Sequence, residues 1–230
     1  MGGPDLRAGR FPTTHWSVVC AAGAATEAER HAALEWLCRR YWAPVVGFIQ
    51  RRGFDHATAE DHAQTFLARA VQRDFFARAE SARGRLRSFL LTSLRNFLVD
   101  EVRRGRAVPP LVTMDDSVRE TAAPADAAFE RQWAEALLAR VLAELELEFA
   151  RRGKGALFRR IESRLLATEA PEPYADVAVE LGLTEQAVKA EVYRLRQRFR
   201  QLVRDEVART VTTAAEIEEE LQVLFRAYRR

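Results

Sequence analysis

The sequence predicts an all-α protein with two helical domains joined by a Pro-containing linker. Its composition favours helix, because Ala, Leu, Glu and Arg dominate while only 11 Gly and 8 Pro occur among 230 residues. Apolar residues recur at spacings of three and four along most of the chain, as on the buried face of a helix. The stretch 107–128 lacks this periodicity and contains Pro109, Pro110 and Pro124, which is typical of a linker.

The residues before the linker predict a first domain over 14–106, after a flexible N-terminus over 1–13. Pro44 is expected at the first turn of a renewed helix, and Gly53 is expected just past a helix end. The connection that follows the second helix is expected to be irregular. The helices predicted for this domain cover about 14–52, 56–73 and 86–104.

A second domain is predicted over 129–204, followed by a C-terminal helical extension over 205–230. The turn 152–155 contains two glycines and a lysine, but it lacks the upstream Gly and the following Ser or Thr of a phosphate-binding loop. The predicted helices of the second domain cover about 129–149, 156–166, 174–181 and 185–204.

The last two of these helices form a helix-turn-helix pattern around Gly182. Thr184 is expected to cap the second helix, and the small Ala178 permits a close approach of the two helices. Such pairs are often only structural, but a basic outer face that carries amides suits the DNA major groove. The residues expected on that outer face are Gln186, Lys189, Ala190, Tyr193, Arg194, Gln197 and Arg198.

The predicted helix over 86–104 lies in the most Arg-rich part of the chain. Thr92 and Asn96 add hydrogen-bonding groups to it, and Phe75, Phe76 and Phe89 add aromatic surface. This combination is typical of a site for single-stranded nucleic acid, although a solvated charged face over a Phe-lined core is the alternative. The arginines concerned are Arg83, Arg85, Arg87, Arg95, Arg103, Arg104 and Arg106.

Little in the sequence indicates an enzyme. The four histidines (His15, His31, His56 and His62) do not pair at metal-ligand spacing, and His62 is expected at the surface. Neither a metal nor a cofactor is expected. Cys20 and Cys38 are expected to be buried free thiols in a reducing cytoplasm. Without a signal-peptide run or a membrane-length apolar stretch, we expect a cytoplasmic protein.

Three segments resemble motifs of one protein family, in the order in which that family carries them. The segment 59–67, AEDHAQTFL, resembles the helix of sigma factors that binds RNA polymerase. The segment 85–100, RLRSFLLTSLRNFLVD, is similar to the helix that melts and reads the −10 promoter element. The segment 174–200 is similar to the −35 recognition motif. The chain therefore resembles the extracytoplasmic-function (ECF) subfamily of sigma-70 RNA polymerase sigma factors, with a short C-terminal helical extension.

The resemblance implies a promoter-specific initiation factor rather than an enzyme. Asp61, Gln64 and Thr65 would contact the clamp helices of the largest subunit of core RNA polymerase, with Thr65 standing where the family usually has an acidic residue. The second domain would meet the flap of the second subunit, and an anti-sigma factor is left open as a further partner. The implied −10 DNA contacts are Arg83, Arg85, Arg87, Thr92, Arg95, Asn96 and Arg103. The implied −35 contacts are Thr184 and the outer-face residues from Gln186 to Arg198 named above.

Two other functions fit parts of the sequence. A stand-alone helix-turn-helix regulator would bind an operator as a dimer, with 207–230 as its dimerisation element, but would leave Asp61 and Gln64 without a role. A helical adaptor would leave both Arg-rich segments unexplained. The extension itself could dock on the protein's own domains, bind polymerase or a regulator, or only cap the fold. We hypothesise that it modulates activity.

Overall fold

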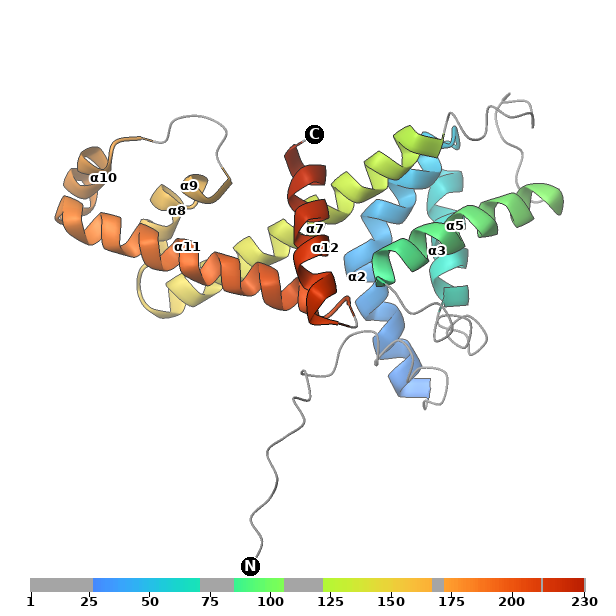
Figure 1. Ribbon diagram of the computed structural model, residues 1–230, viewed down its shortest axis with the longest axis horizontal. Coiled ribbons are helices and arrows are strands. Elements are labelled where there is room, and N and C mark those ends of the chain that lie inside the picture. Colours follow the sequence, from blue (N-terminus) through green and yellow to red (C-terminus); the bar gives the residue numbers. More distant parts are fainter. Residues whose placement is uncertain (1–26, 71–84, 106–121, 167–171, 212, 230) are drawn as a thin grey trace, which may run out of the picture. The chain divides into compact units, whose positions relative to one another are not determined.

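The described part of the chain is helical, as predicted. The computed structural model describes residues 27–70, 85–105, 122–166, 172–211 and 213–229, and no strand occurs among them (Figure 1). The predicted flexible N-terminus, the irregular connection after the second helix and most of the linker lie outside these residues. The helices are α2 (Glu27–Arg51), α3 (His56–Ala70), α5 (Leu86–Arg103), α7 (Ala122–Arg151), α8 (Gly155–Ile161), α9 (Ser163–Leu166), α10 (Tyr174–Leu181), α11 (Glu185–Ala208) and α12 (Ala214–Arg229).

The chain divides into two compact units whose limits differ from the sequence expectation. The first unit comprises 1–135 together with 207–230, and the second unit comprises 136–206. Helices α7 and α11 each contribute residues to both units. Helix α7 begins at Ala122, inside the predicted linker. Pro124 is compatible with this early start because it falls in the first turn, where a backbone N–H would have no intrahelical partner.

Helix α2 packs against α3 and runs without a break through Pro44, so the predicted restart of the helix there is wrong. Every residue from Pro44 to Ile49 is buried, and this packing on all sides holds the helix where one backbone hydrogen bond is missing. At the other end, Gly53 adopts φ 92° just past the last turn, as predicted.

The core of the first unit joins residues that are far apart in the sequence. The Phe48 ring of α2 meets the Phe129 ring of α7 edge-on, with centroids 6.3 Å apart. The rings of Phe66 in α3 and Phe97 in α5 are tilted by 52° to each other, with centroids 5.6 Å apart. The C-terminal extension adds buried apolar side chains from α11, α12 and the turn between them, namely Val207, Val211, Ile217, Leu224 and Ala227.

The second unit is built around the central part of α11. Val188, Val192, Leu195 and Phe199 form its buried face, as predicted from their spacing. The predicted helix 156–166 is divided into α8 and α9 by a turn at Glu162. Between α7 and α8, Gly153 takes φ 71°, and the Lys154 amide donates to the Phe149 carbonyl at 2.9 Å, which closes the turn.

Candidate nucleic-acid interface

Helix α3 presents two of its three predicted contact residues to solvent. Asp61 and Gln64 are exposed, and Thr65 is half-buried beside them. The helix is fixed at its start by Asp55, whose carboxylate accepts hydrogen bonds from the Thr58 amide at 2.9 Å and the Thr58 hydroxyl at 2.7 Å. The Thr58 hydrogen bonds therefore lower the pKa of Asp55. This cap positions the face that carries Asp61 and Gln64.

His62 is buried, so the prediction that it lies at the surface is wrong. Its ring packs edge-on between Phe54 at 5.3 Å and Phe97 at 6.2 Å, measured between centroids. The helical period explains the difference, because His62 follows Ala59 by three residues and precedes Phe66 by four on the buried face of α3. His62 is therefore a core residue of the first unit.

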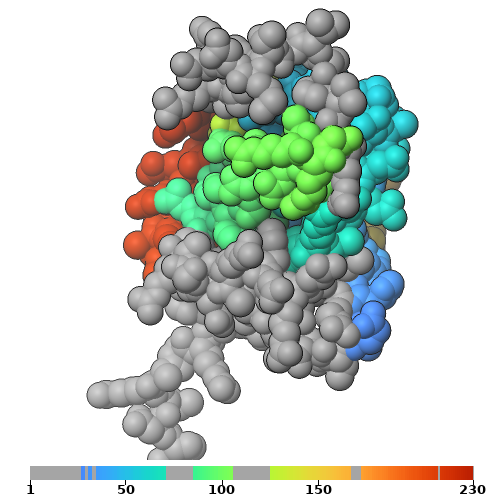
Figure 2. All heavy atoms as spheres, turned by 90° about the vertical axis from the view of Figure 1, so that its right-hand side faces the viewer, coloured from blue at the N-terminus to red at the C-terminus, as the bar shows by residue number. Residues whose placement is uncertain are grey.

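One face of α5 is lined by exposed side chains. They recur every three or four residues and so lie in one row along the helix. Figure 2 shows α5 on the surface of the first unit, between α3 and α12. We call this set the outer row of α5: Ser88, Thr92, Asn96, Val99 and Arg103. It contains three of the predicted −10 contacts and offers hydroxyl, amide and guanidinium donors with an apolar residue among them.

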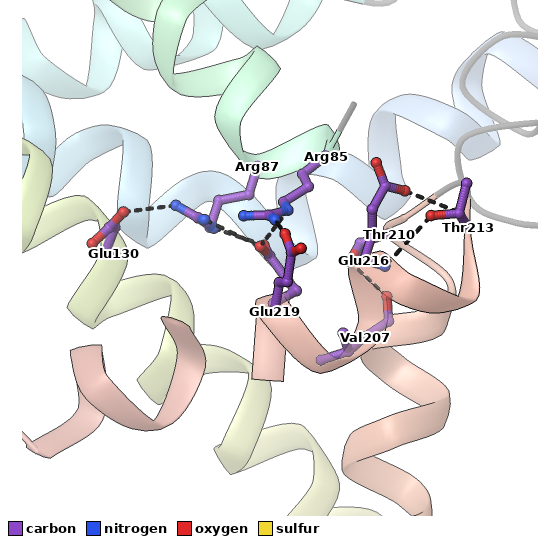
Figure 3. Close-up of polar contacts among 9 residues, drawn as sticks. Arg85, Arg87, Glu130, Val207, Thr210, Thr213, Glu216 and Glu219 are labelled. Atoms are coloured by element: carbon purple, nitrogen blue, oxygen red, sulfur yellow. Dashed lines mark hydrogen bonds and ion pairs between the residues drawn. The ribbon is translucent and has the colours of Figure 1, made fainter. Parts of the chain in front are cut away.

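Two arginines at the start of α5, the N-cap Arg85 and Arg87 in the first turn, point to α12 and α7 (Figure 3). Arg87 donates from Nε to Glu220 Oε1 at 2.7 Å, from Nη2 to Glu220 Oε2 at 3.1 Å, and from Nη1 to Glu130 at 2.8 Å. Arg85 pairs with Glu219, and its Nε lies 3.6 Å from Glu220 Oε2. We call these five residues the arginine–glutamate cluster.

Burial and neighbouring charges act in opposite directions on the pKa of Arg87. Only 4% of the Arg87 side chain and none of the Glu220 side chain is exposed. Burial acts to lower the pKa of Arg87, but the hydrogen bond and charge of Glu220, with the charge of Glu130, outweigh it and raise that pKa. Arg87 thus stays charged and paired, and in this conformation it cannot contact DNA as predicted.

The other predicted contacts of the Arg-rich segment fall into three groups. Arg95 pairs with Asp126 of α7 and is partly exposed. Arg103 is exposed at the end of the outer row. Arg83 lies outside the described residues. Of the predicted arginines that the structure describes, only Arg103 therefore combines exposure with a place in the outer row of α5.

The helix-turn-helix has the local geometry that its sequence predicts. Gly182 adopts the left-handed conformation, φ 63° and ψ 31°, and the next amide, that of Leu183, donates to the Ala178 carbonyl at 2.9 Å. The Thr184 hydroxyl then accepts a hydrogen bond from the Ala187 amide at 3.2 Å and caps α11. The turn therefore fixes α10 against the start of α11 (Figure 1).

The exposed face of α11 carries four of the predicted −35 contacts in one row. Gln186, Lys189, Tyr193 and Gln197 are all exposed, and their spacing of three, four and four residues places them on one side of the helix. The Tyr193 side chain stands out with 65% of its surface exposed. We call these four residues the outer row of α11. Ala190 is half-buried beside the row.

Two predicted arginine contacts of α11 are held by carboxylates of the second unit. Arg198 binds Glu148 of α7 through Nε at 3.0 and 3.1 Å and Nη2 at 2.5 Å. Arg194 binds Glu191, which Lys154 also contacts. The hydrogen bonds from Arg198 and Arg194 lower the pKa values of Glu148 and Glu191 respectively.

Sequence reasoning missed the acidic partners of these arginines. One signal was available in α12, where Ile217, Glu220 and Leu224 follow a helical spacing that places a carboxylate inside an apolar stripe. An acid at such a position indicates a buried cation nearby. The identity of that cation, Arg87, depends on the fold, because 133 residues separate the two.

The comparisons with known proteins add no family assignment. No protein-family model, no curated protein and no solved structure matches this chain. Within the part of the chain that the structure describes, His, Cys, Asp and Glu form no group of three or more that could hold a metal ion. Among the same residues, no helix is both long and apolar enough to cross a membrane.

Proposed function

We propose that this protein is an ECF-type sigma factor that directs core RNA polymerase to promoters. The observation that carries the proposal is the helix-turn-helix, whose left-handed Gly182 and Thr184 cap hold α11 with a continuous exposed row of polar and basic side chains. A helix with a packed apolar face and such an outer row fits the major groove. In this proposal the outer row of α11 reads the −35 element.

The first unit supplies the other two contacts that a sigma factor needs. Asp61 and Gln64 are exposed together on α3, as a contact with the polymerase clamp requires. In the outer row of α5, Thr92, Asn96 and Arg103 offer hydrogen bonds and charge to an unpaired DNA strand. Extruding a base costs a few kcal/mol, so the strand must be held by several such groups at once.

The stand-alone regulator is less well supported because its dimerisation element is already used. The stripe of α12 that would face a second copy is buried within the same chain, with Glu220 and Leu224 both 0% exposed. Two weak DNA contacts on one chain, aligned by polymerase, reach a useful affinity without either being tight. We therefore expect weak DNA binding by the free protein and strong binding by its complex with polymerase.

Run-off transcription with purified core polymerase tests the proposal, on promoters selected from genomic fragments. The double variant Asp61→Ala with Gln64→Ala should lose most transcription and co-migration with core enzyme, because it removes the exposed polar pair of α3. Its matched control, Glu135→Ala with Gln222→Ala, also removes one exposed acid and one exposed amide and should keep wild-type output.

Two results would contradict the sigma proposal. One is the absence of any fragment transcribed in the presence of the wild-type protein. The other is tight, sequence-specific DNA binding by the free protein that core polymerase does not change, which would favour the stand-alone regulator. Folding of each variant is checked by circular dichroism, so that lost activity is not confused with lost structure.

A further inference from the structure

Helix α12 docks on the first unit through one stripe of side chains. Ile217, Glu220, Leu224 and Ala227 follow a spacing of three, four and three residues, and each is at most 5% exposed. Neighbouring positions such as Glu218, Glu219 and Gln222 are exposed. The docked face is thus apolar except for a single carboxylate, that of Glu220.

That carboxylate occupies a site whose geometry also suits phosphate. Arg87 holds Glu220 with two parallel N–H donors, at 2.7 and 3.1 Å. The same planar fork binds phosphate oxygens in the same bidentate way. Arg85 adds a second guanidinium, which contacts both Glu219 and Glu220. Carboxylates of α12 therefore contact both arginines, while Nη1 of Arg87 also holds Glu130 of α7 (Figure 3).

Both arginines lie at the start of the helix that carries the proposed −10 contacts, Arg85 as its N-cap and Arg87 in its first turn. They flank Leu86, the first residue of α5, whose amide donates to the Thr210 carbonyl at 3.1 Å. The extension thus occupies the start of α5 with backbone and side chains together. The outer row of α5, from Ser88 to Arg103, remains exposed farther along the same helix.

We propose that α12 is an internal competitor of DNA. In the docked state Glu219 and Glu220 take the place of DNA phosphates on Arg85 and Arg87, and the outer row of α5 alone is available to the strand. When α12 leaves, both guanidiniums bind the phosphate backbone. This inference rests on the proposed function, because it concerns the affinity of the same α5 surface for promoter DNA.

The docked contact is suited to reversible release. A buried ion pair adds little net stability, because the cost of removing both charges from water offsets their attraction, but it fixes one arrangement. Release of the whole helix returns Glu220 to water, while Arg87 keeps Glu130 of α7 and turns the donors that held Glu220 to water or phosphate, so neither residue is left buried alone. Helix α12 is also the last helix that the structure describes, so it can move away without displacing a helix that follows it among the described residues.

Two variants that weaken docking by different means test the competitor. Glu220→Gln removes the buried charge, and Leu224→Ala removes buried apolar contact without changing charge. The controls, Glu218→Gln and Gln222→Ala, make matching changes at exposed positions of α12. Fluorescence anisotropy measures how tightly each full-length protein binds a fluorescein-labelled single-stranded oligonucleotide of random sequence. The measurement is repeated at salt concentrations from about 50 to about 200 mM.

Both docking variants should bind the oligonucleotide several-fold more tightly than their controls. The dependence of log K on log salt should steepen by about 1.4, because two more phosphates are contacted at about 0.7 each for a single strand. Equal affinities and slopes for variants and controls overturn the competitor. So does tighter binding by Glu220→Gln alone, since loss of one negative charge then explains it.

Hydrogen exchange on the wild-type chain gives a second measurement that needs no substitution. The amides of 214–229 should exchange faster when the oligonucleotide is saturating than when it is absent, and unchanged protection overturns the competitor. Transcription separates the two proposals. Output from the wild-type protein with no gain for either docking variant contradicts only the competitor, whereas no output from any variant contradicts the sigma proposal and the competitor with it.

Discussion

The arginine side chains of this protein differ in the carboxylates that they bind and in how deeply each ion pair is buried. Arg87 is buried against Glu220 and Glu130, whereas Arg198 and Arg194 form partly exposed pairs with Glu148 and Glu191. Exposed pairs of this kind are screened by solvent and add little to stability. Arg194 and Arg198 can therefore exchange a carboxylate for a phosphate at little cost, but Arg87 can do so only if α12 moves.

The pair of Glu148 and Arg198 should make stability depend on pH. The hydrogen bond from Arg198 lowers the folded-state pKa of Glu148, so the pair stabilises the fold above the ordinary glutamate pKa, about 4.3. That contribution is lost as pH falls through the lowered folded pKa. Glu148→Gln should thus cost less than about 1 kcal/mol at pH 7, and the cost should disappear near pH 3.

Urea unfolding of wild type and Glu148→Gln at several pH values measures this difference. Glu146→Gln, at an exposed position of the same helix, is the control and should match wild type throughout. A cost for Glu148→Gln that is as large at pH 3 as at pH 7 would show that packing, and not the ion pair, is responsible.

Helices α2 and α7 approach each other closely at Gly47. Gly47 lies in the middle of α2, where a Cβ atom would come within 1.9 Å of Gln132 Oε1 of α7. Glycine in a helix interior costs about 1 kcal/mol relative to alanine, so its presence here reflects the approach of α7 and not a propensity for helix. The approach of α7 in turn places Glu130 beside Arg87 and Asp126 beside Arg95.

A double-mutant cycle tests this contact between α2 and α7. Gly47→Ala alone should be close to neutral, because the helix propensity gained, about 1 kcal/mol, is offset by displacement of the end of the Gln132 side chain. In a Gln132→Ala background, the same substitution should stabilise it by about 1 kcal/mol, because the helix gains propensity and the clash is gone. Urea unfolding gives the four free energies. Equal effects of Gly47→Ala in both backgrounds would exclude the contact with Gln132 as the reason for glycine.

In the molecule as a whole, the order of segments in the sequence does not match their division between the two compact units. Residues 207–230 follow the second unit in sequence but belong to the first unit in space. They supply buried side chains to its core, and the Thr210 carbonyl accepts the hydrogen bond from Leu86 that begins α5. A chain without 207–230 would lack both.

Deletion of 207–230 should therefore loosen α5 much more than α10. Without Thr210 and α12, the first turn of α5 loses its backbone acceptor and its Arg87 partner, so amides near Leu86 should exchange faster. Amides of Tyr174–Leu181 should keep their wild-type rates. Hydrogen exchange followed by mass spectrometry gives both values. Equal loosening of the two helices would contradict the assignment of 207–230 to the first unit.

Local signals in the sequence determined the helices, the helix-turn-helix and the exposed rows. Gly182, Thr184 and the period of Val188, Val192 and Leu195 act within a few residues, so their effect could be predicted directly. The same reasoning placed Pro44 and His62 wrongly. Burial on every side carried α2 through Pro44, and the helical register put His62 among aromatic rings.

Only the tertiary structure decided which arginines face solvent. Arg87 and Arg103 are the same residue type on the same helix, yet one is buried against Glu220 and the other is exposed. The distinction comes from a helix 133 residues later in the chain, and ion pairing at such a separation leaves no periodic pattern in either segment. Composition and spacing thus determined that α5 is basic, while long-range packing determined which of its charges are available to a partner.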